Sequence, residues 1–227
     1  MENKREMDFE KYNRMCMFNI LKKIPIELNE EQINFIVFTM LKMYSFSEET
    51  YNHSIHTLNI ACVLAKKLEL SKEDAGILEL AALVHDFGKL KIDKEILHST
   101  KKLSPKEFET IKSHSQNTFD MIKDVLPDKV ALTAYHHHEK LNGTGYPQHL
   151  QAEQLTELDK MLTVCDITSA LVLKRSYKAA MDKVGVRTIL TDMVAKGEID
   201  KEYTKCVIDS YVNKIPYDYQ NEEGLIR

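Results

Sequence analysis

Residues that interrupt helices are scarce in this sequence, which has only 7 glycines and 5 prolines among 227 residues. Glycine and proline are the residues least compatible with helix interiors, so their scarcity, together with many Leu, Lys, Glu, Met and Ala residues, favours helices. No stretch alternates convincingly between polar and apolar side chains, which argues against strands. The length fits one domain, or one domain with a helical extension.

Cysteine is also scarce, and the 4 cysteines are widely separated and form no CxxC pair. They are therefore predicted to be buried thiols in a reducing cytoplasm, and not a disulfide framework or a zinc knuckle. The longest apolar stretches, such as Phe35–Phe38, are far too short to span a bilayer. The first residues are charged where a signal peptide would be apolar. These features predict a cytoplasmic chain with no membrane segment.

An excess of positive charge is missing as well, because 31 basic and 35 acidic residues give a net charge of −4 with neutral histidines. A mildly acidic chain is a poor candidate for general nucleic-acid binding, which depends on a surface that neutralises phosphates. A local basic pocket for a small anion is still compatible with this balance.

Apolar residues recur at helical spacing almost throughout, so we predict an all-α fold. The strongest start signals are the capping box of Asn29 with Gln32 and the sequence from Ser104 through Pro105 to Glu107. The predicted helices cover roughly residues 6–24, 29–44, 48–70, 71–85, 104–122, 128–138, 157–173, 178–195 and 201–213. Residues 1–46 are expected to be a helical extension of a domain that occupies residues 47–227.

The histidines and acids that could carry chemistry are unevenly placed. His85 is followed directly by Asp86 after an apolar stretch, residues 136–138 are all histidine, and Asp166 lies inside an apolar helix. Buried acids are costly unless positive charge neutralises them, so acids among several histidines predict bound cations. Imidazole and carboxylate ligands suit Fe, Mn, Co, Ni or Zn, and the absence of cysteine argues against a structural zinc site. The number of ligands suggests two or three ions.

Glu49 lies four residues before His53, so both side chains emerge on one face of a helix, one turn apart. This separation would let both residues address one metal cluster. Taken alone, Glu49 fits equally well as an acid that complements the helix dipole in the first turn.

Several motifs follow one another in order along the chain. HDFGK stands at residues 85–89, His114 follows a Lys-Ser pair, and HHE at residues 137–139 is followed by NGTGYP at residues 142–147. HD alone is a weak signal, but the ordered set at these separations is highly specific. Together the motifs resemble the HD-GYP family of phosphodiesterases, over roughly residues 47–215.

The resemblance implies an all-helical HD fold whose bi- or trinuclear metal centre hydrolyses cyclic di-GMP to pGpG, GMP or both by a metal-activated hydroxide. Iron or manganese is the expected metal, with Zn, Ni, Co and Mg as alternatives. The implied metal ligands are Glu49, His53, His85, Asp86, His114, His137, His138 and Asp166. Asp86 would bridge two metals, and Lys89 would contact the scissile phosphate. The implied substrate-binding residues are Lys89, Tyr146, Arg175 and Lys178.

The chain departs from the family pattern at Ser169, because the family usually has Asp three residues after the Asp166 position. His56 and His136 are additional histidines, interpreted as neighbouring polar residues. Two other functions stay open: an HD phosphohydrolase acting on another nucleotide such as cyclic GMP-AMP, and a catalytically weak module that binds cyclic di-GMP or a protein partner. The N-terminal helices are a candidate contact for a homodimer.

Overall fold

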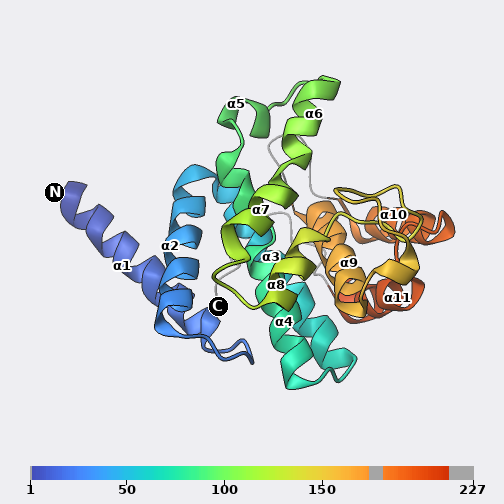
Figure 1. Ribbon diagram of the computed structural model, residues 1–227, viewed down its shortest axis with the longest axis horizontal. Coiled ribbons are helices and arrows are strands. Elements are labelled where there is room, and N and C mark those ends of the chain that lie inside the picture. The colour runs from blue at the N-terminus through green and yellow to red at the C-terminus, as the bar shows by residue number, and fades with distance from the viewer. Residues whose placement is uncertain (1, 174–180, 215–227) are drawn as a thin grey trace.

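One helix, α3 (Glu48–Lys67), is the element against which α2, α4, α9 and α11 pack in the computed structural model (Figure 1). The structure describes residues 2–173 and 181–214, with side chains from residue 12 onward. The other elements are α1 (Glu2–Leu21), α2 (Glu30–Phe46), α4 (Lys72–Val84), η1 (Phe87–Lys91), α5 (Lys94–Leu97), α6 (Pro105–Lys112), α7 (His114–Ile122), α8 (Asp128–Tyr135), η2 (Ala152–Gln154), α9 (Glu157–Val172), α10 (Lys183–Ala195), α11 (Lys201–Ser210) and η3 (Val212–Lys214). No strand occurs in these described ranges beyond one isolated bridge, so the all-α prediction is confirmed.

Side-chain caps determine where several of the helices begin. The Asn29 side chain accepts the backbone N–H of Gln32 at 2.9 Å, and the Gln32 side chain accepts the N–H of Asn29 at the same distance. Ser104 and Glu107 make the same reciprocal box at the start of α6, and a third box opens α9. Each box satisfies two backbone N–H groups that a helix start leaves without partners. The capping box predicted at Asn29 and the helix start predicted at Ser104 are therefore confirmed.

The prediction of one helix over residues 104–122 is wrong, because the segment forms two helices, α6 and α7, that are interrupted at Ser113. The Ser113 N–H donates to the carbonyls of both Glu109 and Ile111. Its hydroxyl donates to the carbonyl of Thr110 at 2.7 Å. Such local bonds compete with the regular helical ladder and close the last turn of α6. As a result, α7 begins at His114.

The hydrophobic core extends from α1 and α2 into the helices that follow. Met17, Met40 and Met43 are buried in the same apolar cluster as Leu64 and Leu83. These three methionines of the N-terminal helices thus serve in packing, as unbranched side chains commonly do. The division into residues 1–46 and 47–227 stays a prediction.

The outer faces of α1 and α2 carry large exposed apolar side chains, those of Tyr12, Met15 and Phe38. A homodimer contact through these helices stays a prediction. Across the described parts of the chain, the helices are too short or too polar for any of them to cross a membrane.

Gly88 allows α7 to lie directly against η1. A Cβ atom at Gly88 would overlap the carbonyl oxygen of His114 and lie 2.5 Å from the backbone nitrogen of Thr118. The Thr118 hydroxyl accepts the N–H of Gly88 and donates to the carbonyl of His85, both at 2.8 Å. The segment that carries His85 is therefore fixed to the helix that carries His114.

We expect Gly88→Ala to lower the free energy of unfolding by about 1–3 kcal/mol, because the added methyl group must push α7 away. Urea denaturation measures this change. Lys91→Ala, at an exposed position of the same 3₁₀ helix, is the matched control and should stay within about 0.5 kcal/mol of the wild type. A Gly88→Ala protein as stable as the wild type would contradict the close approach.

Candidate metal centre

Two groups of potential metal ligands lie on α3 and α7 and just after the ends of α4 and α8. These four helices and α9 pack together (Figure 1). In each group the ligand atoms lie within 4.8 Å of one another, and the groups are His53, His85 and Asp86, and His114, His137 and His138. Asp166 on α9 contacts both groups. Its Oδ1 lies 2.8 Å from His53 Nε2, and its Oδ2 lies 3.6 Å from His138 Nδ1. The structure thus brings together all the predicted ligands except Glu49.

Asp86 lies between the two groups and presents one carboxylate oxygen to each. Its Oδ2 lies 3.3 Å from His85 Nε2 and 3.7 Å from His53 Nε2. Its Oδ1 lies 3.4 Å from His114 Nε2 and 4.0 Å from His137 Nε2. A carboxylate in this position can contact a different cation with each oxygen, as the bridging role requires.

Backbone carbonyls set the orientation of three of the histidine rings. The Nδ1–H groups of His85, His114 and His137 donate to carbonyls three residues earlier, at 2.8, 2.6 and 2.6 Å. A carbonyl can only accept, so in a neutral ring the proton is on Nδ1 and the lone pair of Nε2 faces the cluster. This is the arrangement that supporting bonds impose on histidines that bind metals.

Two buried atoms of the cluster have no hydrogen-bond partner among the described residues, His85 Nε2 and Asp86 Oδ1. Buried polar atoms are rarely left in this state, and both atoms are electron-pair donors. The residues present therefore fit bound metal ions, which would satisfy both atoms.

Electrostatics keep most of these groups in the protonation states that metal binding requires. Burial alone would raise the pKa of Asp86, but the ammonium of Lys89, 2.6 Å away, and the ring of His85 hold it well below its usual value. Burial, with a contribution from Lys89, lowers the pKa of His114 to about 4. Burial also lowers the pKa of His137. His85 differs, because Asp86 outweighs burial and raises its pKa.

Lys89 and Tyr146, the predicted phosphate and pocket contacts, lie at the edge of the cluster. Lys89 is half-buried beside Asp86. The Tyr146 ring packs on the His138 ring with 4.7 Å between centroids and 38° between planes. The ammonium of Lys112 lies 5.6 Å from the centroid of Tyr146. Sequence reasoning missed Lys112 as a site residue, although it belongs to the Lys-Ser pair that precedes His114.

Glu139 anchors the loop that carries Tyr146, a role that its place in the HHE motif did not reveal. Its buried carboxylate accepts the backbone N–H groups of Gln148 at 2.6 Å and Leu150 at 3.0 Å. The N–H of Tyr146 donates to the carbonyl of His138 at 3.1 Å. Glu139 therefore ties the end of the loop to the segment that supplies two ligands.

Of the predicted ligands that the structure describes, one is outside both ligand groups. Glu49 is half-buried one turn before His53 and belongs to neither ligand group, so its part in a third metal site stays a prediction. Arg175 and Lys178 lie outside the described residues.

His136 contacts neighbouring polar residues, as expected for this additional histidine. Its Nε2 lies 3.2 Å from the side-chain oxygen of Gln148, and its Nδ1 lies 3.4 Å from Asp159 Oδ2. Both partners lie near the loop and the start of α9. We therefore do not count His136 among the candidate ligands.

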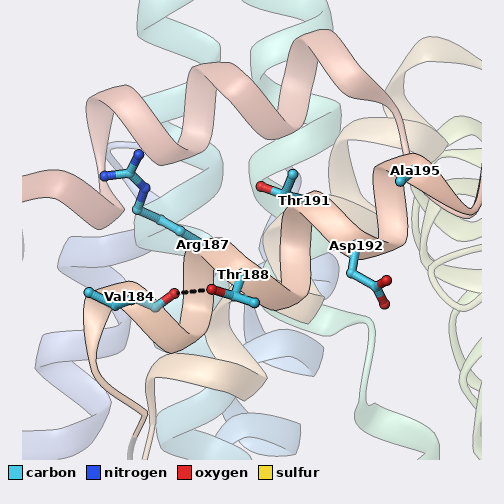
Figure 2. Close-up of a pocket in the computed structure, with 6 residues that line it drawn as sticks. All are labelled: Val184, Arg187, Thr188, Thr191, Asp192 and Ala195. Atoms are coloured by element: carbon cyan, nitrogen blue, oxygen red, sulfur yellow. Dashed lines mark hydrogen bonds between the residues drawn. The ribbon is translucent and has the colours of Figure 1, made fainter.

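A separate hollow of about 560 Å³ lies on α10 (Figure 2). Among the described residues, those that line it are Val184, Arg187, Thr188, Thr191, Asp192 and Ala195. All come from one helix, and the Thr188 hydroxyl is already bonded to the carbonyl of Val184 at 2.9 Å. None of the predicted site residues that the structure describes lines this hollow, so the described candidate site is the metal centre.

Residues 36–203, which make up more than half of the sequence, match the HD domain family. The chain belongs to the HD domain family, and this confirms the resemblance read from its motifs.

Two relatives are informative. The cyclic di-GMP phosphodiesterase PA4108 of Pseudomonas aeruginosa is 35% identical over 142 residues, which are 62% of this chain and 34% of that protein. The 3'3'-cGAMP-specific phosphodiesterase 1 of Vibrio cholerae is 32% identical over 184 residues, 80% of this chain and 43% of that protein. The chain therefore spans less than half the length of these relatives.

Solved structures share the fold. Bd1817, a HDG"Y"P protein from Bdellovibrio bacteriovorus, superposes with a TM-score of 0.60 at 15% identity, over 88% of this chain and 69% of that one. The PgpH phosphodiesterase HD domain of L. monocytogenes, in complex with cyclic-di-AMP, has a TM-score of 0.59 at 16% identity, over 77% and 93%. At these identities the likeness concerns the fold alone.

Replacing Glu139 with Gln should loosen the loop that carries Tyr146, because the amide turns an NH₂ group toward one of the two backbone donors. A buried group left without a partner costs about 1–3 kcal/mol, which urea denaturation detects. Limited proteolysis should also cut the loop faster. Glu153→Gln, at an exposed position in the same stretch, is the control. Wild-type stability and cleavage of the Glu139→Gln protein would refute the anchoring role.

Proposed function

We propose that this chain is a metal-dependent phosphodiesterase that hydrolyses cyclic di-GMP to pGpG, GMP or both. The observation that carries the proposal is the position of Asp86, with one oxygen toward each ligand group and Lys89 at 2.6 Å. The name of the Pseudomonas relative supports the choice of substrate. All four cysteines are free thiols, which supports a reducing compartment such as the cytoplasm.

The centre would hold two divalent ions, one at each ligand group, with Asp86 between them. Imidazole and carboxylate together suit iron or manganese, and Zn, Ni, Co or Mg are alternatives. When bound, such ions acidify water and neutralise charge on phosphoryl oxygens, which is the chemistry that phosphodiester hydrolysis needs.

The chain's own residues would bind and orient the substrate. The Lys89 side chain is 13% exposed, so its ammonium can donate to a phosphate oxygen while it stays beside Asp86. The Tyr146 ring offers a flat surface next to His138 on which a base or ribose can pack. Lys112, near the same ring, adds positive charge at the rim. Arg175 and Lys178 are proposed to bind the second phosphate or the guanine edges.

Cyclic GMP-AMP is a second candidate substrate. The relative that aligns with 80% of this chain is named a 3'3'-cGAMP-specific phosphodiesterase. Both substrates present phosphodiesters of the same kind to the metal centre, so the choice depends on contacts to the bases.

The test is hydrolysis by anaerobically purified protein loaded with Mn(II) or Fe(II), with cyclic di-GMP, 3'3'-cGAMP and cyclic di-AMP as substrates and chromatography of the products. We expect cyclic di-GMP to be cleaved fastest. Asp86→Asn should lose bound metal and reduce the rate by about a hundredfold or more, because it removes the charge between the ligand groups.

Asp120→Asn, which changes a partly exposed acid on α7, is the control and should keep full activity. Full metal content and activity in the Asp86→Asn protein would show the mechanism to be wrong. A metal-loaded wild type that binds cyclic di-GMP and cleaves none of the substrates would favour a binding module.

We further propose that Glu49 contributes to a third ion. Glu49→Gln should then lower the metal content and slow the conversion of pGpG to GMP, while the first cleavage continues. Glu48→Gln is a matched control, because Glu48 is also in the first turn of α3 and complements the same helix dipole. Chromatography of the products formed from pGpG measures this effect. Unchanged GMP formation by the Glu49→Gln protein would count against this role.

A further inference from the structure

Ser169 stands where the family resemblance led us to expect an aspartate, and its hydroxyl joins two histidines. Ser169 Oγ lies 2.9 Å from His53 Nδ1 and 2.9 Å from His56 Nδ1. The other nitrogen of the His56 ring lies 2.6 Å from the hydroxyl of Tyr211, at the end of α11. Ser169 and His56 are fully buried. A continuous chain of hydrogen bonds therefore runs from α11 to the metal centre.

The Nδ1 atom of His53 is held by this series of side-chain hydrogen bonds, whereas the Nδ1 atoms of three other histidine ligands are held by backbone carbonyls. His85, His114 and His137 each donate Nδ1–H to a carbonyl three residues earlier. The Nδ1 of His53 instead contacts Ser169, while its Nε2 faces Asp166 at 2.8 Å. Because α9 supplies both Ser169 and Asp166, one helix contacts both nitrogens of the His53 ring.

The direction of the hydrogen bonds follows from the requirement for a metal ligand. Nε2 of His53 can bind a cation only when its proton is absent, so in the neutral ring Nδ1 carries the proton and donates it to Ser169 Oγ. The serine hydroxyl then donates to His56 Nδ1, and His56 Nε2–H donates to the Tyr211 oxygen. Each side chain in this series then has a hydrogen-bond partner, and none of them carries a charge. An aspartate at position 169 would introduce a buried charge.

We propose that Ser169, His56 and Tyr211 are positioning residues that hold His53 in its Nδ1-protonated form with Nε2 directed at the metal site. The proposal rests on the metal centre of the proposed function. It assigns a role to two residues, His56 and Ser169, that depart from or add to the family pattern.

The test is a titration of the full chain with Mn(II), without substrate, in which electron paramagnetic resonance measures free Mn(II). Ser169→Ala removes the acceptor for His53 and should weaken binding of at least one ion by about 10–100-fold, the range found when such supporting contacts are lost. Ser169→Thr keeps a hydroxyl and should restore most of the affinity.

Ser54→Ala is the matched control. The Ser54 hydroxyl is fully buried on α3 next to His53, yet it has no hydrogen-bond partner among the described residues. Its removal should leave Mn(II) affinity unchanged. The rings of Tyr211 and His56 lie 5.6 Å apart, centroid to centroid. Tyr211→Phe keeps this ring contact and loses only the hydroxyl, so it should weaken Mn(II) binding less than Ser169→Ala does.

Thermal unfolding separates positioning from a purely structural role. A structural role would lower the melting temperature of the metal-free Ser169→Ala protein and leave the increase caused by Mn(II) unchanged, whereas positioning reduces that increase. If Ser169→Ala does not fold, Tyr211→Phe decides. If these variants bind Mn(II) with wild-type affinity and show the wild-type increase in melting temperature, this proposal is wrong while the proposed metal centre stands. A wild-type chain that binds no Mn(II) would overturn the metal centre itself, and this proposal with it.

Discussion

The rest of the site depends on one constraint: two carboxylates that are buried among histidine rings, Asp86 and Asp166, must be neutralised. A buried carboxylate costs several kcal/mol unless positive charge lies close by. Lys89 supplies part of that charge to Asp86, but the pKa of neighbouring His114 is about 4, so its ring is neutral near pH 7. Bound cations at the ligand groups would complete the neutralisation. The ligands must surround the cations and carboxylates, so they come from helices that are far apart in the sequence.

Much of the surrounding structure serves to hold the rings and carboxylates in place. Backbone carbonyls fix three histidines, and the hydrogen-bonded chain through Ser169 fixes a fourth. Gly88 and Thr118 lock η1 to α7, so two histidine ligands on different elements keep a constant separation. Glu139 performs the same task for the loop with Tyr146. A site of this kind depends on rigid supports, since small displacements of ligands weaken metal binding.

The sequence alone allowed the helical fold and most of the cluster to be predicted, because those signals are local or chemical. The capping box at Asn29 depends on residues three apart, and the pairing of His85 with Asp86 is costly to bury without a cation. The break at Ser113 was missed because side-chain bonds to the backbone there override a continuous helical pattern. The contact between His56 and Tyr211 joins residues 155 apart, so no local pattern reveals it.

The most direct test of the metal centre is X-ray diffraction from crystals of the Mn(II)-loaded chain, collected on both sides of the manganese absorption edge. The account predicts at least two anomalous peaks, one on each side of the Asp86 carboxylate and each among the histidines of one ligand group. Anomalous density that is absent from this cluster, or that lies elsewhere on the molecule, would contradict it.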